Sequence, residues 1–394
     1  MQKKIVAVSL FTLFFLATAA LVAEIYVRAT HKGSYLTGLM KRDAVFHHIP
    51  PPYYEGTMSS PGDFDIYFRT NNRGMRGPGD YNYEKPEGVF RIAVMGDSFT
   101  FGVGVDADKT ASYLLGELLD NEEPGRYEVL NFGVNSYSPI LEYAYLKNEV
   151  IRYDPDMVIV MLDISDIQDD YLYEPHIVYA PGGEVIACDP MRVRGKPDFK
   201  ALCMKYSRLC YVMETKLFDS FRKMAVIGFR NYMANKFTGR RNKTEILTNR
   251  DIDNIYFDRF LMFREGKNEK VVARHWSRTA KYIKMIKGYL DGRGIRFILV
   301  TYPYGHQVGE RQWQKGRAYW AFEPGKVYDA GKGFSVISDF AKENDIGFIN
   351  LYGAMLAGKD STLYFDSDGH WTEAGQAAAG RAIFDSNVFR KNLE

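Results

Sequence analysis

The chain has 394 residues, and with 51 Lys and Arg against 49 Asp and Glu its formal net charge is only +2. This balance excludes the strongly basic field typical of a nucleic-acid-binding protein, so we expect no nucleic-acid partner. The length and a hydrophobic content of 46% fit a folded protein with one large α/β domain or two smaller ones.

Residues 1–30 have the pattern of a membrane anchor or a signal peptide. Basic residues precede Ile5–Ala23, a run without a charge that is long enough to cross a bilayer once. Ala17-Thr18-Ala19 also fits a signal-peptide cleavage site, but the apolar run continues beyond it, which favours an uncleaved anchor. We therefore expect a single-pass inner-membrane protein with its body in the periplasm, or a secreted or periplasmic protein if the signal is cleaved.

Residues 31–85 are interpreted as a linker and lead-in segment. His47 and His48 adjoin a Pro-rich stretch, and we expect them on the surface of this linker rather than as metal ligands.

From residue 86 onward the chain alternates between strand and helix signals. The expected strands are continuous apolar runs, as burial on both faces of a parallel sheet requires. They are Phe90–Gly96, Tyr127–Val134, Asp156–Ser165, Arg296–Pro303 and Ile346–Tyr352, with helices expected over 110–121, 139–153 and 374–387. The pattern predicts a flavodoxin-like, doubly wound α/β domain over 86–394.

The pattern breaks over 171–275, which we interpret as a helical insertion or cap. Phe199–Lys243 is helix-prone and interleaves apolar and basic residues. Such a helix could cover the active edge of the sheet, lie on a membrane surface or simply pack against the domain.

Three cysteines fall near or within this insertion, namely Cys188, Cys203 and Cys210. The compartment of an exported protein permits a disulfide, and one of the three cysteines would then keep a free thiol. On one straight helix Cys203 and Cys210 would be about 10 Å apart, too far to bridge. Three buried thiols are the alternative.

Two short stretches carry the chemistry. Ser98 follows the first expected strand in "GDSFTFG", at the edge where parallel sheets gather reactive groups. His370 lies in "YFDSDGHWTEAG", two residues after Asp368 and four after Asp366. A serine nucleophile needs a base, and an imidazole base needs a carboxylate. Either stretch alone is weak evidence, because Asp and Ser also cap helices and fill turns.

Taken in order, these stretches resemble the SGNH (GDSL-type) hydrolase family. Ser98 matches its first block, Gly133 in "NFGVNSYS" its second and His370 its last, and "FRTNNRGMRG" resembles the lead-in of many bacterial members. The resemblance covers about 68–170 and then 296 to the C-terminus. It implies Ser98 as nucleophile, His370 as base and Gly133 as an oxyanion donor.

The sequence departs from the family pattern at two places. "DISD" replaces the usual Gly-x-Asn-Asp, so that Ser165 stands where an oxyanion-binding asparagine is expected. Losing such a donor costs on the order of 10²–10³ in turnover. The acid usually stands three residues before the histidine, where this chain has Ser367. The shorter spacing resembles a branch linked to alginate O-acetylation, which favours Asp368 as the acid and leaves Asp366 in reserve.

The resemblance implies a serine esterase or O-acyltransferase that acts on acetyl esters of cell-surface or exported polysaccharide. A membrane-bound O-acyltransferase is the partner that this branch suggests. Alternatives are a lipid or small-ester hydrolase, and a catalytically weak glycan-binding or scaffold subunit of a polysaccharide acetylation machine. We expect no cofactor and no metal, since His176 and His275 lack ligand spacing. His306 is expected in a loop after a strand.

Overall fold

The structure is a computed structural model that describes residues 2–30, 39–194, 196–197, 203, 207–213, 269–319, 322 and 325–394. Its centre is a parallel sheet of five strands in the order β13-β12-β7-β5-β6. The strands are β5 (Phe90–Gly96), β6 (Tyr127–Gly133), β7 (Met157–Leu162), β12 (Arg296–Thr301) and β13 (Gly347–Asn350). Taken in chain order this is the 2-1-3-4-5 arrangement of flavodoxin-like folds, and it confirms the expected fold class.

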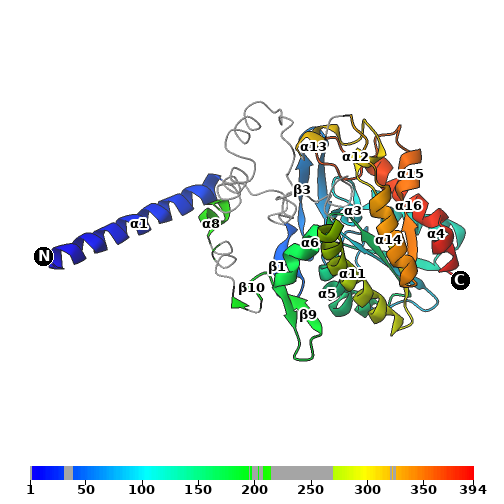
Figure 1. The fold of residues 1–394 in the computed structure, drawn as a ribbon, viewed down its shortest axis with the longest axis horizontal. Coiled ribbons are helices and arrows are strands. Elements are labelled where there is room, and N and C mark those ends of the chain that lie inside the picture. The colour runs from blue at the N-terminus through cyan, green and yellow to red at the C-terminus, as the bar shows by residue number, and fades with distance from the viewer. Residues whose placement is uncertain are drawn as a thin grey trace.

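Helices cover both faces of the sheet, as expected for right-handed crossovers when the strand order reverses once, between β5 and β7. On one face α4 (Ala111–Glu122) packs against α16 (Glu373–Asp385). On the other, α11 (Glu269–Asp291) packs against α5 (Pro139–Asn148) and α6 (Asp166–Tyr173). Figure 1 shows these layers around the sheet.

Helix α14 (Gly331–Glu343) packs against β13. Shorter helices are α3 (Ser98–Phe101), α12 (Gly305–Val308), α13 (Gln314–Tyr319), α15 (Tyr352–Ala357) and α17 (Asn387–Lys391), with 3-10 turns at Ala107–Lys109, Val150–Tyr153 and Glu174–His176.

The lead-in segment is folded rather than extended. It forms two antiparallel hairpins, β1 (Lys41–Asp43) with β2 (His47–Ile49) and β3 (Glu55–Ser60) with β4 (Phe64–Arg69). Buried residues of this segment form a second small core with two residues that follow Ser98. The members are Leu39, Met58, Phe68, Phe101 and Val103. Residues 39–69 are therefore part of the α/β body and support the segment that carries Ser98.

The expected helical insertion contains strands where the structure describes it. Its described part holds a hairpin of β8 (Ile177–Tyr179) and β9 (Val185–Cys188), a short pair of β10 (Arg192–Val193) and β11 (Lys196–Pro197), and the helix α8 (Arg208–Val212). Most of the helix-prone stretch 199–243 lies outside the described residues, and so does the basic end of that stretch.

A disulfide joins Cys203 to Cys210, with Cα atoms 6.0 Å apart. The two cysteines are not on one straight helix, because Ser207 has an extended backbone and begins α8 as its N-cap. That break brings closer two residues that a continuous helix would hold apart. Cys188 keeps a free, buried thiol.

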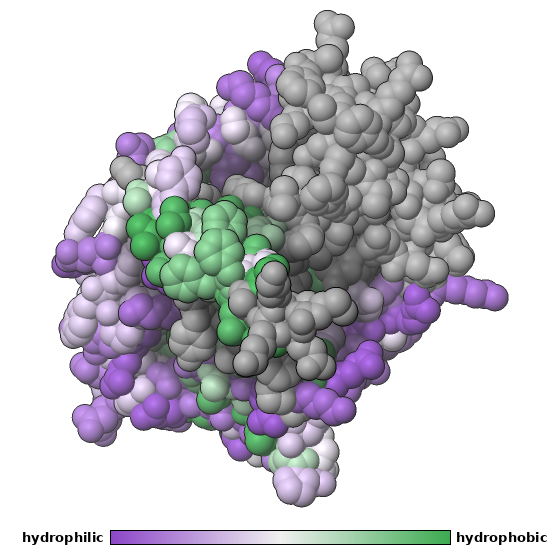
Figure 2. Space-filling model, turned by 90° about the vertical axis from the view of Figure 1, so that its left-hand side faces the viewer, coloured by the Kyte–Doolittle hydropathy of each residue, from purple (hydrophilic) through white to green (hydrophobic). Residues whose placement is uncertain are grey.

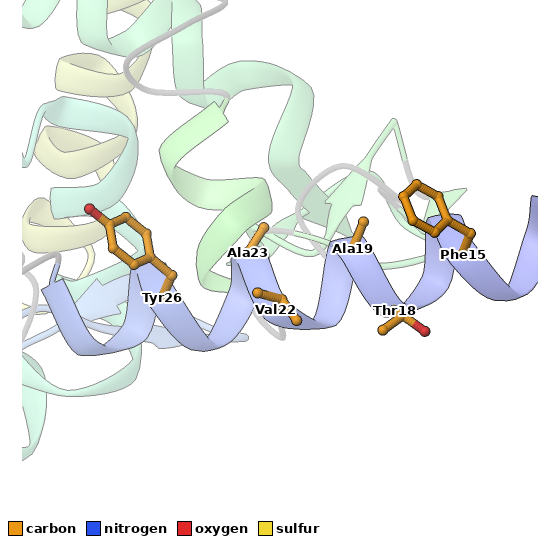
Figure 3. Close-up of a pocket in the computed structure, with 6 residues that line it drawn as sticks. All are labelled: Phe15, Thr18, Ala19, Val22, Ala23 and Tyr26. Carbon is orange, nitrogen blue, oxygen red and sulfur yellow. The ribbon is translucent and has the colours of Figure 1, made fainter.

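Helix α1 (Gln2–Thr30) extends away from the body (Figure 1). Its part Val8–Thr30 is long and apolar enough to cross a membrane, and none of it is buried in the structure. Figure 2 views the molecule from the end that carries α1, where hydrophobic residues form a patch. A shallow apolar pocket runs along α1, with Phe15 and Tyr26 at its two ends in Figure 3. By length and composition this helix fits a membrane span or a signal sequence.

Candidate active site

Ser98 is positioned by a tight turn at the carboxyl end of β5. Gly96 adopts a φ of 157°, and a Cβ there would meet Thr100 Oγ1 at 2.2 Å and Met161 Cβ at 2.9 Å. Asp97 then caps α3, accepting the Phe99 N–H at 2.8 Å. The turn makes Ser98 the first residue of α3, half-buried at the switch point between β5 and β7.

The C-terminal loop brings His370 to this serine. His370 Nε2 lies 2.7 Å from Ser98 Oγ, and its Nδ1 is in direct hydrogen-bond contact with Asp368 Oδ1. Gly369, with a φ of 92°, allows the loop to turn between the two residues. The expected nucleophile, base and acid thus form one continuous hydrogen-bond chain, as acyl transfer by serine requires.

Asp368 and His370 shift the pKa of one another. Burial opposes charge on His370, but the charge of Asp368 and its hydrogen bond outweigh burial, so the pKa of His370 lies above its ordinary value of 6.5. Burial would raise the pKa of Asp368, yet His370 holds it below the ordinary value. The pair therefore favours an ionised Asp368 that orients the imidazole and stabilises its protonated form.

A second carboxylate lies beside the serine. Burial, and then the charge of Asp163, raise the pKa of Asp97 to about 7. Asp97 accepts the Tyr302 hydroxyl at 3.0 Å as well as the Phe99 N–H. Asp97 also contributes charge that raises the pKa of His370.

Aromatic rings form one wall of the site. The Phe99 ring lies 4.8 Å from the His370 ring, 5.0 Å from Tyr302 and 5.0 Å from Trp371, between ring centroids. The imidazole thus rests on an apolar surface, which restricts its rotation and shields it from water.

The structure does not support Gly133 as an oxyanion donor. Its single backbone N–H donates to Asn131 Oδ1 at 2.9 Å, and a Cβ at Gly133 would meet Phe101 N at 2.3 Å. Gly133 therefore serves the close packing of β6 on α3. Asn131 completes the link by donating to the Thr100 carbonyl at 2.8 Å.

Ser165 is also engaged elsewhere. Its hydroxyl donates to Asp163 Oδ2 at 3.2 Å, and its N–H donates to Asp163 Oδ1 at 2.7 Å. Tyr304 approaches the same hydroxyl at 3.2 Å. Because a serine has one O–H proton, Ser165 has no free donor for an oxyanion in this arrangement.

The residues that follow Gly133 form a turn that is bonded to the end of β5. The Val134 N–H donates to the Gly96 carbonyl at 3.0 Å, and the Tyr137 N–H closes a turn onto the Val134 carbonyl at 3.0 Å. Ser136 has a φ of 61° within this turn. Among the described residues, the N–H groups of Asn135 and Ser136 have no acceptor, and neither does that of Ser98. The sequence does not reveal this turn, because the positive φ of a non-glycine residue such as Ser136 is set by the surrounding structure and not by the residue type.

The reserve acid Asp366 faces away from His370. Its carboxylate accepts the backbone N–H groups of Gln314 and Lys315 and forms an ion pair with Lys315 Nζ at 2.9 Å. These contacts hold the start of α13. Of the two candidate acids Asp366 and Asp368, only Asp368 forms a hydrogen bond with His370.

The other histidines lie apart from the triad. His47 and His48 are half-buried rather than exposed on a linker, and their rings lie tilted against Tyr173, with ring centroids 4.8 and 6.2 Å away. His306 is buried on α12 against Phe322, with ring centroids 4.0 Å apart. Within the described ranges, no group of three or more His, Cys, Asp or Glu could hold a metal ion.

Comparisons with known proteins give structural likeness only. No protein-family model and no curated protein matches the sequence. The acetyl xylan esterase AlAXEase is similar at 13% identity and a TM-score of 0.36, with 75% of this chain and 98% of that chain covered. A putative lipolytic protein of the G-D-S-L family from Desulfitobacterium hafniense is similar at 13% identity and a TM-score of 0.34, with 75% of this chain and 97% of that chain covered. Axe2, an acetylxylan esterase from Geobacillus stearothermophilus, is similar at 13% identity and a TM-score of 0.37, with 76% of this chain and 95% of that chain covered.

Proposed function

We propose that this chain is a membrane-anchored serine esterase of the SGNH type that acts on acetyl esters of cell-surface or exported polysaccharide. The observation that carries the proposal is the hydrogen-bond chain from Asp368 through His370 to Ser98. The similar solved structures, two of them esterases of acetylated xylan, agree with this chemistry. The candidate membrane span supports an exported body.

The reaction follows from the positions of three groups. His370 takes the Ser98 hydroxyl proton as Oγ attacks the ester carbonyl carbon, and the same proton passes to the departing sugar oxygen. The acyl group is then bonded to Ser98. A water molecule attacks this acyl-enzyme, gives one proton to His370 and releases the acid, and the proton returns to Ser98.

The oxyanion requires donors that are not already used. We propose the N–H groups of Ser98 and of the turn at Asn135 and Ser136, since these lack acceptors among the described residues. The turn is tied to the end of β5 by the bond from Val134 to Gly96, which keeps it beside Ser98.

A second candidate is transfer of the acyl group to a sugar hydroxyl, with a membrane-bound O-acyltransferase as the donor's source. The helix α1 favours this candidate, because it would hold the site close to a bilayer. The chemistry is the same, with a sugar hydroxyl in place of water.

The test is release of p-nitrophenol from its acetate ester by the full chain in detergent. We expect turnover by the wild type and loss of at least about 10³-fold in Ser98→Ala and His370→Ala. Ser335→Ala, an exposed serine on α14, is the matched control and retains activity. Trapping an acetyl group on the peptide that contains Ser98 identifies the acyl-enzyme.

Activity that persists in Ser98→Ala contradicts the nucleophile. Inertness of the wild type on acetyl esters, together with polysaccharide binding that is unchanged in Ser98→Ala, favours the glycan-binding subunit instead. Added oligosaccharide acceptors distinguish transfer from hydrolysis by the appearance of acetylated product.

A further inference from the structure

The hairpin of β3 and β4 reaches the loop that carries the acid and the base. At its turn, the Asp63 carboxylate accepts three consecutive backbone N–H groups of that loop. The distances are 3.1 Å from Asp366, 3.0 Å from Ser367 and 2.7 Å from Asp368. The Ser60 hydroxyl donates to the same carboxylate at 3.2 Å. Hydrogen bonds to an ionised acceptor are about twice as strong as neutral ones.

Packing joins the same two segments to the region after Ser98. The rings of Phe64, beside Asp63, and Phe365, beside Asp366, lie 4.8 Å apart. Gly104 approaches both rings so closely that a Cβ there would lie 2.5 Å from Phe365 and 2.7 Å from Phe64. The hairpin, the acid and base loop and the glycine-rich segment after the nucleophile therefore meet at one place.

We propose that Asp63 is a positioning residue that holds the loop of Asp368 and His370 at the correct distance from Ser98. The proposal rests on the esterase function above and deepens it. Asp63 does not touch the reacting atoms and acts through the backbone of Asp366, Ser367 and Asp368. Without this acceptor, three N–H groups lose their partner and Gly369 allows the loop to shift. A misplacement of about 1 Å costs about 10²-fold in rate.

The experiment compares Asp63→Ala and Asp63→Asn with the control Asp65→Ala in the full chain in detergent. Asp65 is an exposed residue of β4 on the same hairpin. We expect Asp63→Ala to lower kcat by about 10- to 100-fold with KM changed by less than about 3-fold. Asp63→Asn keeps the shape of the side chain and loses its charge, so its kcat lies between those of the wild type and Asp63→Ala. Asp65→Ala has the kcat of the wild type.

Two readouts separate positioning from a loss of folded protein. The amplitude of the initial p-nitrophenol burst counts competent sites, and positioning predicts an unchanged amplitude with a slower rate. The acid limb of the kcat/KM profile reports His370, which Asp368, Asp97 and Asp163 face. We expect this limb to move to lower pH in Asp63→Ala, because the contact with Asp368 loosens.

Hydrogen exchange of the peptide over 364–370 tests the contact without any activity. We expect faster exchange in Asp63→Ala than in Asp65→Ala. The proposal would be overturned if Asp63→Ala had the same kcat, pH profile and exchange rate as the wild type. It would also be overturned if a lower burst amplitude alone accounted for the loss of activity in Asp63→Ala. A wild type without Ser98-dependent turnover would defeat the esterase function, whereas the exchange experiment would still decide whether Asp63 holds the loop.

Discussion

The His370 imidazole lies between its partner Asp368 and the serine that it activates, with the charges of Asp97 and Asp163 nearby. All three carboxylates favour the protonated ring, and together they outweigh its burial. The base is active only when neutral, so the arrangement that stabilises the transition state also moves the onset of activity to higher pH.

We expect kcat/KM to fall as pH decreases through a value above 6.5, the ordinary pKa of histidine. In Asp368→Asn the largest of the three charges that raise the pKa of His370 is gone while burial remains, so the acid limb moves to lower pH and kcat drops by about 10²–10⁴-fold. The measurement is a pH profile of p-nitrophenyl acetate hydrolysis. Asp366→Asn is the control, and its limb stays in place because Asp366 faces Lys315. A shift in Asp366→Asn alone would reassign the acid.

Glu142 is a buried carboxylate behind the site. It is 0% exposed on α5, and neither oxygen has a hydrogen-bond partner among the described residues. Burial, and then the charges of Asp170 and Asp97, raise its pKa well above the ordinary value. The folded chain therefore holds this proton more tightly than the unfolded chain, and stability falls as pH rises above about 4.3 toward the folded pKa.

We expect Glu142→Gln to lose less stability than the wild type between about pH 5 and pH 8, by about 1.4 kcal/mol for each pH unit of this range that lies below the folded pKa of Glu142. Urea midpoints at the two pH values provide the measurement. Glu343→Gln, at the exposed end of α14, shows the wild-type dependence. Parallel curves for Glu142→Gln and wild type would show that Glu142 ionises normally.

At the scale of elements, the strand β6 packs closely against the short helix α3 at Gly133. Gly133→Ala places a Cβ 2.3 Å from Phe101 N and 2.6 Å from Thr100 C, which are backbone atoms that cannot rotate away. We expect a loss of about 1–3 kcal/mol in the free energy of unfolding and lower turnover, since α3 begins with Ser98. Thermal unfolding and the acetate assay measure the two effects.

Gly288→Ala is the matched control, because nothing lies within 4 Å of its added Cβ. Alanine is the better helix former, so this change on α11 leaves stability equal or higher. Equal stability of Gly133→Ala and wild type would mean that α3 can move freely against β6.

The central strands were predictable because each contains a largely apolar run, and the middle strand β7 is buried at every residue. The β3 and β4 hairpin of the lead-in was not predicted, because its strands are largely exposed and depend on packing against residues after Ser98. The β8 and β9 hairpin lies where a helical insertion was expected. Local pattern does not reveal which tertiary surface a short segment will find.

Residue type and order predicted which side chains lie together as Asp368, His370 and Ser98, whereas the partner of the Gly133 N–H could not be predicted. Donor availability depends on which acceptor each N–H meets, and the Gly133 N–H meets a side chain two residues away. Asp63 and Asp368 are separated by 305 residues, so no local spacing connects them.

At the scale of the whole molecule, α1 is separate from the α/β body in composition and exposure. Phe15 is 64% exposed and lies near the middle of the apolar helix. A charge at the centre of a spanning helix costs about 2.5–3.5 kcal/mol. We expect Phe15→Arg to lower the membrane-bound fraction, measured by carbonate extraction of cell membranes, while Phe15→Leu remains bound.

An equal soluble fraction for Phe15→Arg and Phe15→Leu would contradict a span that depends on this face of α1. The detergent-solubilised Phe15→Arg chain should keep wild-type turnover, because α1 contributes no residue to the triad.

The nucleophile and the base are 272 residues apart. The helix α16, which follows His370, packs on α4, and its Gln376 accepts the Ala111 N–H at 2.8 Å and donates to the Phe99 carbonyl at 2.9 Å. During synthesis Ser98 emerges long before Asp368 and His370. A growing chain therefore carries Ser98 without its hydrogen-bond partner until the last segment docks, and a chain that ends before His370 lacks the hydrogen-bond chain on which the proposed esterase function rests.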